Sequence, residues 1–225
     1  MSPPGEDFMD RVPAKIVTWD EIEKWCTTLS TDVRESGYTP DAIVGLARGG
    51  WIPARLLCDR LNISELYSLK TSHWGITATR DGKATLSGRL GSELAGKRVL
   101  VVDDITDTGE SLKLAFEHVS SLSPADVRTA TMLHITHSQF EPHHYAVVVP
   151  EKRWKWFIFP WNYYEDMFTF ISRALEGGSL DAGAISAHLK RLNGLTFSPS
   201  ALSGLLHSLE SQHRIRRNGR VWSLP

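Results

Sequence analysis

Two adjacent acids follow a run of apolar residues near the middle of the chain. Residues 99–102 read Val-Leu-Val-Val, and Asp103 and Asp104 come directly after them. A continuous apolar run is typical of a buried parallel strand, and ligands of open α/β sheets bind just beyond the carboxyl ends of such strands. We therefore expect both carboxylates to project into a ligand-binding crevice.

The residues after these acids predict a helix whose first turn faces the same crevice. Residues 108–111 read Thr-Gly-Glu-Ser, and apolar side chains then recur at helical spacing, at Leu112, Ala115, Phe116 and Val119. Unpaired N–H groups and the positive end of the helix dipole favour anions at a helix start, so a phosphate monoester fits there. No Gly-Lys-Ser or Gly-Lys-Thr follows the strand, so the segment is not a Walker A loop.

The segment 99–112 resembles the phosphoribosyl pyrophosphate (PRPP) signature of type I phosphoribosyltransferases, in which two acids, two variable residues and Asp-Thr-Gly follow hydrophobic residues. The resemblance implies that Asp103 and Asp104 bind the ribose hydroxyls, which suits ionised carboxylates because these only accept hydrogen bonds. It implies that the next loop wraps the 5′-phosphate, through Asp107, Thr108, Gly109, Glu110 and Ser111. The alternative is a Rossmann-type turn in which Asp104 or Asp107 only caps a helix.

This resemblance covers residues 15–170 and implies an α/β fold, a mostly parallel sheet flanked by helices, in a phosphoribosyltransferase domain over 1–175. The polar segment 71–96 corresponds to the mobile hood loop of the family, with Ser72, His73 and Trp74 near its start. Closure of such a loop excludes water from the reacting sugar. Hydrophobic periodicity independently predicts helices over 18–37, 52–61 and 162–175, and strands over 42–46, 66–69, 128–135, 145–149 and 156–159.

The last part of the chain resembles a small winged-helix module over 180–225, after a linker at 177–179. Two short helices are expected over 184–192 and 200–212, and Asn218-Gly219 predicts a hairpin. From 176 to 225 six Lys and Arg residues outnumber three acids, which allows contact with nucleic acid. The second helix carries no Lys or Arg, however, so we favour a packing or subunit-contact role over DNA binding.

A second loop, Arg48-Gly49-Gly50, lies between a predicted strand and a predicted helix. It resembles the pyrophosphate-binding loop of the same transferase family, and two glycines permit the close backbone approach to an anion that a side chain would block. The alternative is an ordinary turn. Lys70, at the mouth of the hood loop, is a further candidate for a pyrophosphate contact.

Five aromatic residues crowd into residues 154–161. The stretch resembles the purine-holding segment of the xanthine-guanine branch and its archaeal relatives, which implies that Trp156 stacks on the base and that the main chain of Phe157 reads its edge. The alternative is an aromatic cluster that closes the edge of the sheet.

Two positions depart from that branch. Its members usually carry a lysine for the purine 6-oxo group on the preceding strand, whereas this chain offers His134 and His137. A histidine can donate to a 6-oxo group or accept from a 6-amino group, so both are candidate base contacts. Asn162 stands where relatives often carry an aspartate that helps to hold magnesium, and a neutral amide binds a hard cation less strongly.

The resemblance implies a purine phosphoribosyltransferase of salvage metabolism, with PRPP and guanine, hypoxanthine or xanthine as substrates. Asp107 is the expected proton acceptor, and Mg2+ the expected cofactor, held mainly by PRPP with water-mediated help from Asp103 and Asp104. The alternatives are an adenine phosphoribosyltransferase, a PRPP-sensing DNA-binding transcription regulator and, less favoured because of the Trp156 segment, a transferase for a pyrimidine.

Composition sets the remaining expectations. The formal net charge of −1 gives no global preference for nucleic acid or membranes, and the two cysteines, Cys26 and Cys58, lack CxxC spacing. We expect buried free thiols in a reducing compartment. The N-terminus lacks the basic and apolar regions of a leader, and no segment approaches the length of a membrane span, which predicts a cytoplasmic protein. The family resemblance implies a homo-oligomer, dimer or tetramer.

Overall fold

The computed structural model describes residues 11–73, 84–87, 90 and 92–225. The described residues divide into two compact units, a sheet unit within 19–154 and a C-terminal unit made of residues 11–18 and 155–225. The division therefore lies elsewhere than the linker predicted at 177–179. Two contacts explain this, because the N-terminal strand pairs with residues 156–158 and the helix over 163–175 packs on the helices that follow it.

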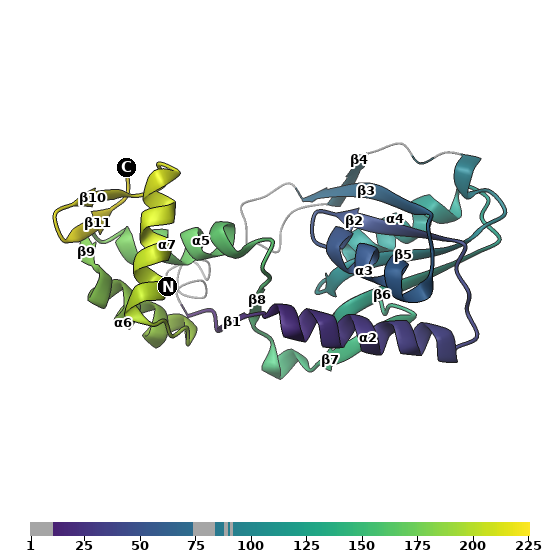
Figure 1. Ribbon diagram of the computed structural model, residues 1–225, viewed down its shortest axis with the longest axis horizontal. Coiled ribbons are helices and arrows are strands. Elements are labelled where there is room, and N and C mark those ends of the chain that lie inside the picture. The colour runs from purple at the N-terminus through teal and green to yellow at the C-terminus, as the bar shows by residue number, and fades with distance from the viewer. Residues whose placement is uncertain (1–10, 74–83, 88–89, 91) are drawn as a thin grey trace, which may run out of the picture. The chain divides into compact units, whose positions relative to one another are not determined.

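The sheet unit is built on six strands in the order β4-β3-β2-β5-β6-β7 (Figure 1). All are parallel except β4, which runs antiparallel to β3 at one edge. The central strands are buried on both faces, as continuous apolar runs predict. The bounds are β2 Ala42–Ala47, β3 Leu66–His73, β4 Ala84–Ser87, β5 Arg98–Thr106, β6 Asp126–Ile135 and β7 His144–Val149.

Helices cover both faces of this sheet. On one face α2 (Trp19–Glu35) and α3 (Trp51–Leu61) pack against side chains that include Leu100 and Val102 of β5. On the other face α4 (Glu110–Ser120) packs against side chains that include Val99 and Val101. Successive residues of a strand point to opposite faces, so one apolar run supplies both cores.

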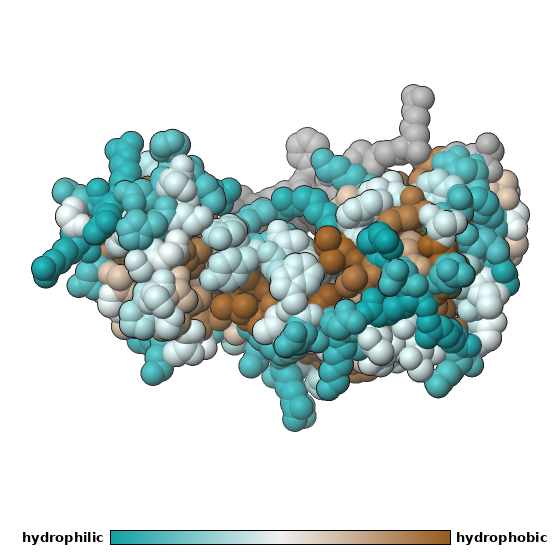
Figure 2. Space-filling model, in the orientation of Figure 1, coloured by the Kyte–Doolittle hydropathy of each residue, from teal (hydrophilic) through white to brown (hydrophobic). Residues whose placement is uncertain are grey.

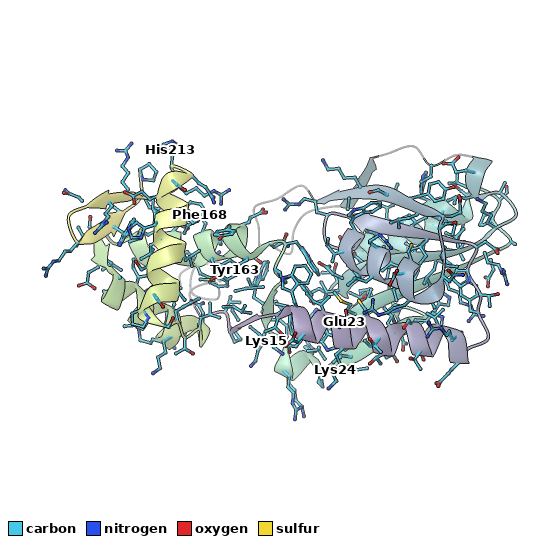
Figure 3. The ribbon with its side chains drawn as sticks, viewed as in Figure 1. Lys15, Glu23, Lys24, Tyr163, Phe168 and His213 are labelled. Carbon is cyan, nitrogen blue, oxygen red and sulfur yellow. The ribbon has the colours of Figure 1, made fainter. Side chains whose placement is uncertain are left out.

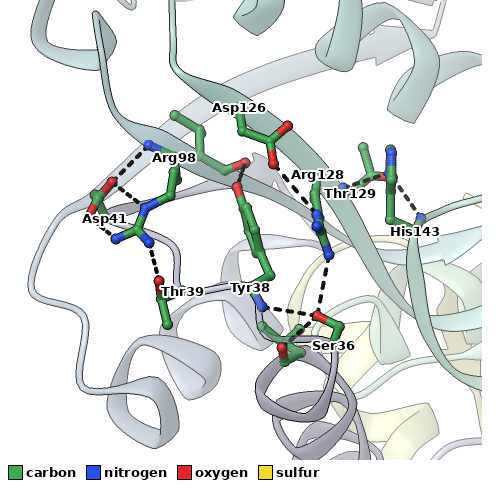
Figure 4. Close-up of polar contacts among 11 residues, drawn as sticks. Ser36, Tyr38, Thr39, Asp41, Arg98, Asp126, Arg128, Thr129 and His143 are labelled. Carbon is green, nitrogen blue, oxygen red and sulfur yellow. Dashed lines mark hydrogen bonds and ion pairs between the residues drawn. The ribbon is translucent and has the colours of Figure 1, made fainter.

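A polar network holds the amino ends of β2, β5 and β6 together (Figure 4). The Arg98 guanidinium donates to both carboxylate oxygens of Asp41, at 2.7 and 3.0 Å, and holds the pKa of that carboxyl well below its usual range. Tyr38 donates its hydroxyl to Val99 O at 2.9 Å, and Arg128 of β6 lies over the Tyr38 ring. These contacts fix the register of the strands at the end opposite the predicted site.

The segment predicted as a hood loop contains more regular structure than expected. β3 continues to His73, and the residues of β4 return along it, Lys70 opposite Ser87 and His73 opposite Ala84. A 3-10 turn follows at Ser92–Leu94. A polar composition suits an edge strand as well as a loop, so periodicity could not separate the two. Trp74 and the rest of 74–83 lie outside the described residues.

The C-terminal unit begins with β1 (Ala14–Ile16), which pairs in parallel with β8 (Trp156–Ile158). Three helices follow, α5 (Tyr163–Leu175), α6 (Ala182–Asn193) and α7 (Pro199–Ser211), with β9 (Leu180–Asp181) between the first two. β10 (Arg216–Asn218) and β11 (Val221–Ser223) form the predicted hairpin, and β9 adds a third antiparallel strand. Ser198 caps α7 by accepting from Ala201 N, as its position before Pro199 predicts.

None of the helices within the described residues is both long and apolar enough to cross a bilayer. The two cysteines are free and buried, as expected. Burial raises the pKa of the Cys26 thiol to about 12, and also raises the pKa of Cys58.

We expect both thiols to resist modification in the folded protein. At pH 8 a thiol of pKa about 12 is ionised in about one molecule in ten thousand, and the thiolate is the reactive form. Titration with a chromogenic disulfide reagent should therefore detect almost no thiol before denaturation and both thiols in denaturant. Rapid labelling of the native protein would contradict the buried placement.

Candidate functional site

The acid pair lies near the carboxyl end of β5. The strand extends to Thr106, beyond the predicted apolar run, so both acids belong to the strand itself. Asp104 N donates to Asp103 Oδ1 at 2.9 Å, and Asp104 is almost fully buried. Burial and the neighbouring Asp104 carboxylate raise the pKa of Asp103 well above its usual value. A cation or a hydroxyl donor would stabilise the charged form of this carboxyl, so the pair is suited to such a ligand.

The glycine loop after β2 packs directly on this acid pair. A Cβ atom on Gly49 would overlap the carboxylate of Asp104, and one on Gly50 would lie 2.7 Å from Asp103 Cα. The backbone N–H of Gly50 donates to the Asp103 carboxylate. Gly50 has a φ of −66°, which any residue adopts, so glycine is required here for space and not for backbone conformation.

Two basic side chains accompany this loop. Arg48 is exposed, and the peptide bond that precedes it is cis. Lys70 is exposed on β3, where the register places it opposite Ala47, the last residue of β2. The structure therefore brings all four residues predicted to bind pyrophosphate to the edge of the sheet where the acid pair lies.

The turn after β5 is held by a loop that follows β6. Gly109 has a φ of +87°, and a Cβ atom there would lie 2.8 Å from Phe140 N. Gln139 N donates to Thr108 O at 3.0 Å, which joins the two loops through their backbones. Gly109 itself has no side chain to cap α4, and Thr108 Oγ1 accepts from Glu110 N at 3.4 Å. α4 therefore begins within the turn that is predicted to bind phosphate, and its first backbone N–H groups lie there. The residues of this turn are Asp107, Thr108, Gly109, Glu110 and Ser111.

Asp107 accepts two hydrogen bonds at the same oxygen. Trp154 Nε1 donates to Asp107 Oδ1 at 3.1 Å, and His137 Nε2 lies 2.7 Å from that oxygen. Carboxylate oxygens accept, so His137 Nε2 carries the proton of this bond. Glu151 lies 4.0 Å from the other ring nitrogen of His137. The sequence analysis did not predict this network, because the aromatic run marks Trp154 without indicating its partner.

His134 is buried on β6, where its ring stacks on that of Tyr145 at 5.1 Å between centroids. Burial lowers the pKa of His134, which favours the neutral imidazole. The register pairs it with Thr106, the residue before Asp107, so it lies one strand away from the turn after β5.

Trp156 and Phe157 lie in the other unit, half-buried on β8. The rings of Phe159 and Trp161 stack with 4.9 Å between their centroids. Phe159 is buried, so part of the aromatic run contributes to the core of that unit. Asn162 precedes α5, and its backbone carbonyl oxygen accepts from Asp166 N. Trp156, Phe157 and Asn162 thus belong to the C-terminal unit, whereas the acid pair and its loops belong to the sheet unit.

Within the part of the chain that the structure describes, no three His, Cys, Asp or Glu side chains gather as metal ligands would. The adjacent carboxylates of Asp103 and Asp104 supply oxygen atoms that could ligate a metal ion near the carboxyl end of β5. Two carboxylates suit a hard cation that keeps water or takes further oxygens from a bound ligand.

The sequence matches the family described as "Phosphoribosyl transferase domain" over residues 14–167. Among solved structures, a purine phosphoribosyltransferase from Pyrococcus horikoshii is 30% identical, with a TM-score of 0.56 over 66% of this chain and 93% of that one. A xanthine-guanine-hypoxanthine phosphoribosyltransferase from Helicobacter pylori is 20% identical, with a TM-score of 0.57 over 69% and 98%. A hypothetical protein from Neisseria gonorrhoeae with bound ppGpp is 22% identical, with a TM-score of 0.58 over 67% and 90%.

We expect Gly50→Ala to destabilise the protein by about 1–3 kcal/mol, because the new methyl group meets backbone atoms of β5 that cannot move aside. Gly177→Ala is the matched control, since its Cβ atom would meet nothing within 4 Å, and it should change stability by no more than about 0.5 kcal/mol. Urea unfolding measures both. Equal midpoints for the two variants would show that the loop does not lie against the acid pair.

Proposed function

Since the chain belongs to the phosphoribosyltransferase family, we propose that it transfers ribose 5-phosphate from PRPP to a purine base and releases pyrophosphate, as a purine phosphoribosyltransferase. The observation that carries this proposal is the packing of Gly49 and Gly50 on Asp103 and Asp104. It places a loop suited to one anion beside carboxylates suited to a sugar diol, and the start of α4 follows on the same strand. PRPP joins these three chemical groups in one molecule.

In this proposal each part of PRPP has its own partners. Asp103 and Asp104 accept from the ribose hydroxyls. The turn 107–111 and the first N–H groups of α4 hold the 5′-phosphate. Arg48, Gly49, Gly50 and Lys70 hold the pyrophosphate, where the basic side chains neutralise the leaving group and the two glycines let it come close to the backbone.

Magnesium fits this donor set, because the acid pair supplies the hard oxygen ligands that this cation prefers. Asp103 and Asp104 would hold the ion through water, together with oxygens of PRPP. When bound, it would supply Lewis-acid stabilisation of the leaving pyrophosphate.

Asp107 is the proposed proton acceptor. The bond from the sugar carbon to pyrophosphate breaks, a bond from that carbon to a purine nitrogen forms, and the base loses the proton of its imidazole ring at N7. Among the described residues, His137 and Trp154 both reach Asp107 Oδ1, so Oδ2 is the oxygen that can take this proton. We propose His137 as a partner of Asp107, in place of the base contact predicted from the sequence.

For the base we propose a 6-oxopurine, with adenine as the alternative. In the sheet unit His134 is the proposed base contact, and Trp156 and Phe157 of the C-terminal unit keep the base-binding role that the resemblance implies. The 30% identical Pyrococcus horikoshii protein is a purine phosphoribosyltransferase, which supports a purine over a pyrimidine. A neutral His134 supports either purine, since its N–H suits a 6-oxo oxygen and its bare nitrogen suits a 6-amino group.

A pyrophosphate-release assay with PRPP and magnesium tests the proposal. We expect release with guanine, hypoxanthine or xanthine and little with adenine or orotate, because we propose that His134 donates its N–H to the 6-oxo group of the purine. Release with adenine alone would establish the alternative. No release with any base, while PRPP still protects the protein against thermal unfolding, would refute the transferase and favour a PRPP sensor.

Asp107→Asn tests the proton acceptor. We expect kcat to fall about 10²–10⁴-fold, the usual contribution of a general base, with PRPP affinity nearly unchanged. Trp154→Phe removes one donor to Asp107 and should lower kcat by about tenfold, the worth of one hydrogen bond to a charged group. Trp19→Phe, at an exposed position on α2, is the control and should leave kcat unchanged. Wild-type turnover by Asp107→Asn would exclude the assigned role.

A further inference from the structure

The hairpin at the end of the chain carries a cluster of exposed arginines. All three residues of β10 are exposed, Arg216 and Arg217 among them, and Arg220 lies in the turn that follows. Residues 211–225 contain no Asp or Glu. Within the described part of the chain, Arg216 and Arg220 form no ion pair, so both charges are open to a partner.

The hairpin is anchored to the fold of this unit. Trp222 of β11 is buried, and β9 pairs with β11 on its other side. Arg214, just before the hairpin, lies over the ring of Phe168 at 4.7 Å. Phe168 belongs to α5 and is labelled in Figure 3. Backbone pairing on both sides of β11 and packing at the base of the hairpin therefore hold the arginines in defined positions.

Helix α7 presents small polar residues beside this hairpin. Its apolar side is buried, through Leu202, Leu205, Leu206 and Leu209. Its exposed positions include Ser200, Gly204, His207 and Ser211. Small side chains leave the helix backbone accessible, which allows close approach to a groove.

One contact joins the helix to the hairpin. His207 Nδ1 lies 2.7 Å from Ser203 O and so donates, which leaves Nε2 to accept from Arg217 Nη1 at 3.2 Å. The His207 ring also meets Trp222 edge to face, at 5.3 Å between centroids. The exposed face of α7 and the arginine hairpin are thus one continuous surface.

The chemistry of this surface suits a polyanion better than an apolar protein face. No large apolar side chain is exposed between residues 176 and 225, all of which the structure describes. In the view of Figure 2 mostly hydrophilic residues cover the region of β10 and β11. A protein partner would gain little from burying such a surface, whereas phosphates would pair with the open arginines.

We propose that α7 and the β10–β11 hairpin bind double-stranded DNA. α6 ends at Asn193 and α7 begins at Pro199, so the two helices follow each other across a short turn, as in a helix-turn-helix. In such motifs the second helix is the one that enters a major groove. The arginines of the hairpin then meet the phosphates beside that groove. The absence of Lys and Arg from the second helix disfavoured this role in the sequence analysis. The His207–Arg217 contact removes that objection, because the hairpin supplies the charge next to the helix.

The test is fluorescence anisotropy of a labelled duplex of random sequence, about 20 base pairs long, with the full chain at about 50 and 200 mM salt. We expect a Kd on the order of 10⁻⁶ M at the lower salt, the range of binding to phosphates alone. The double variant Arg216→Gln/Arg220→Gln should bind at least about tenfold more weakly, and the slope of log K against log salt should fall by about 1.8 for two lost phosphate contacts.

Two further variants locate the surface. Lys190→Gln/Arg191→Gln removes the same charge from exposed positions at the end of α6 and should change the affinity by less than about threefold. Gly204→Glu adds a carboxylate on the exposed side of α7, where its Cβ atom meets nothing within 4 Å, and should abolish binding. Thermal unfolding confirms that each variant is folded, and PRPP turnover should be unchanged in all three.

Three results would each overturn the proposal. The first is no detectable binding at the lower salt. The second is an equal loss in the two double variants, which would reflect net charge alone. The third is single-stranded DNA of the same length bound as tightly as the duplex, since a helix in a groove requires a duplex.

Discussion

The close approach of the loop after β2 to the end of β5 is the contact on which the site depends. Two residues without a Cβ atom let the backbone of one strand-to-helix connection lie against the carboxylates of the neighbouring strand. The contact exists because β2 and β5 are adjacent and parallel, so their carboxyl ends reach the same edge of the sheet. Lys70 reaches the same edge through a second pairing, because β3 lies parallel to β2 on its other side and places Lys70 opposite Ala47.

A second contact of the same kind connects β5 to β6. Gly109 lies against Phe140, and the segment that contains Phe140 also contains His137, which bonds to Asp107. The turn that would hold a phosphate and the acid that would take a proton are therefore supported by one loop. At the opposite end of the strands, Asp41, Arg98 and Tyr38 hold the register. The functional edge of the sheet is thus built on strands that are tied at both ends.

In the C-terminal unit, contacts between short elements create a surface that no single element has. Residues 198–225 predict a capped helix and a hairpin, and both are present. β9 pairs with β11, although the two strands lie far apart in the sequence. Arg217 of the hairpin donates to His207 of α7, which is a different element. They convert a helix and a hairpin into one surface.

The sequence by itself determined the elements and the chemistry that they carry. Apolar runs and turn residues are local signals, so they identified β2, β5 and α4, and the Asp103–Gly109 segment and the two glycines of the loop identified the family. Only the tertiary structure decided the partners. Examples are the pairing of β1 with β8, the pairing of β4 with β3 and the bond of Trp154 to Asp107. These contacts join residues whose separation in the sequence follows no helical or strand periodicity. Such contacts arise when separate elements pack, and no local pattern in the sequence encodes them.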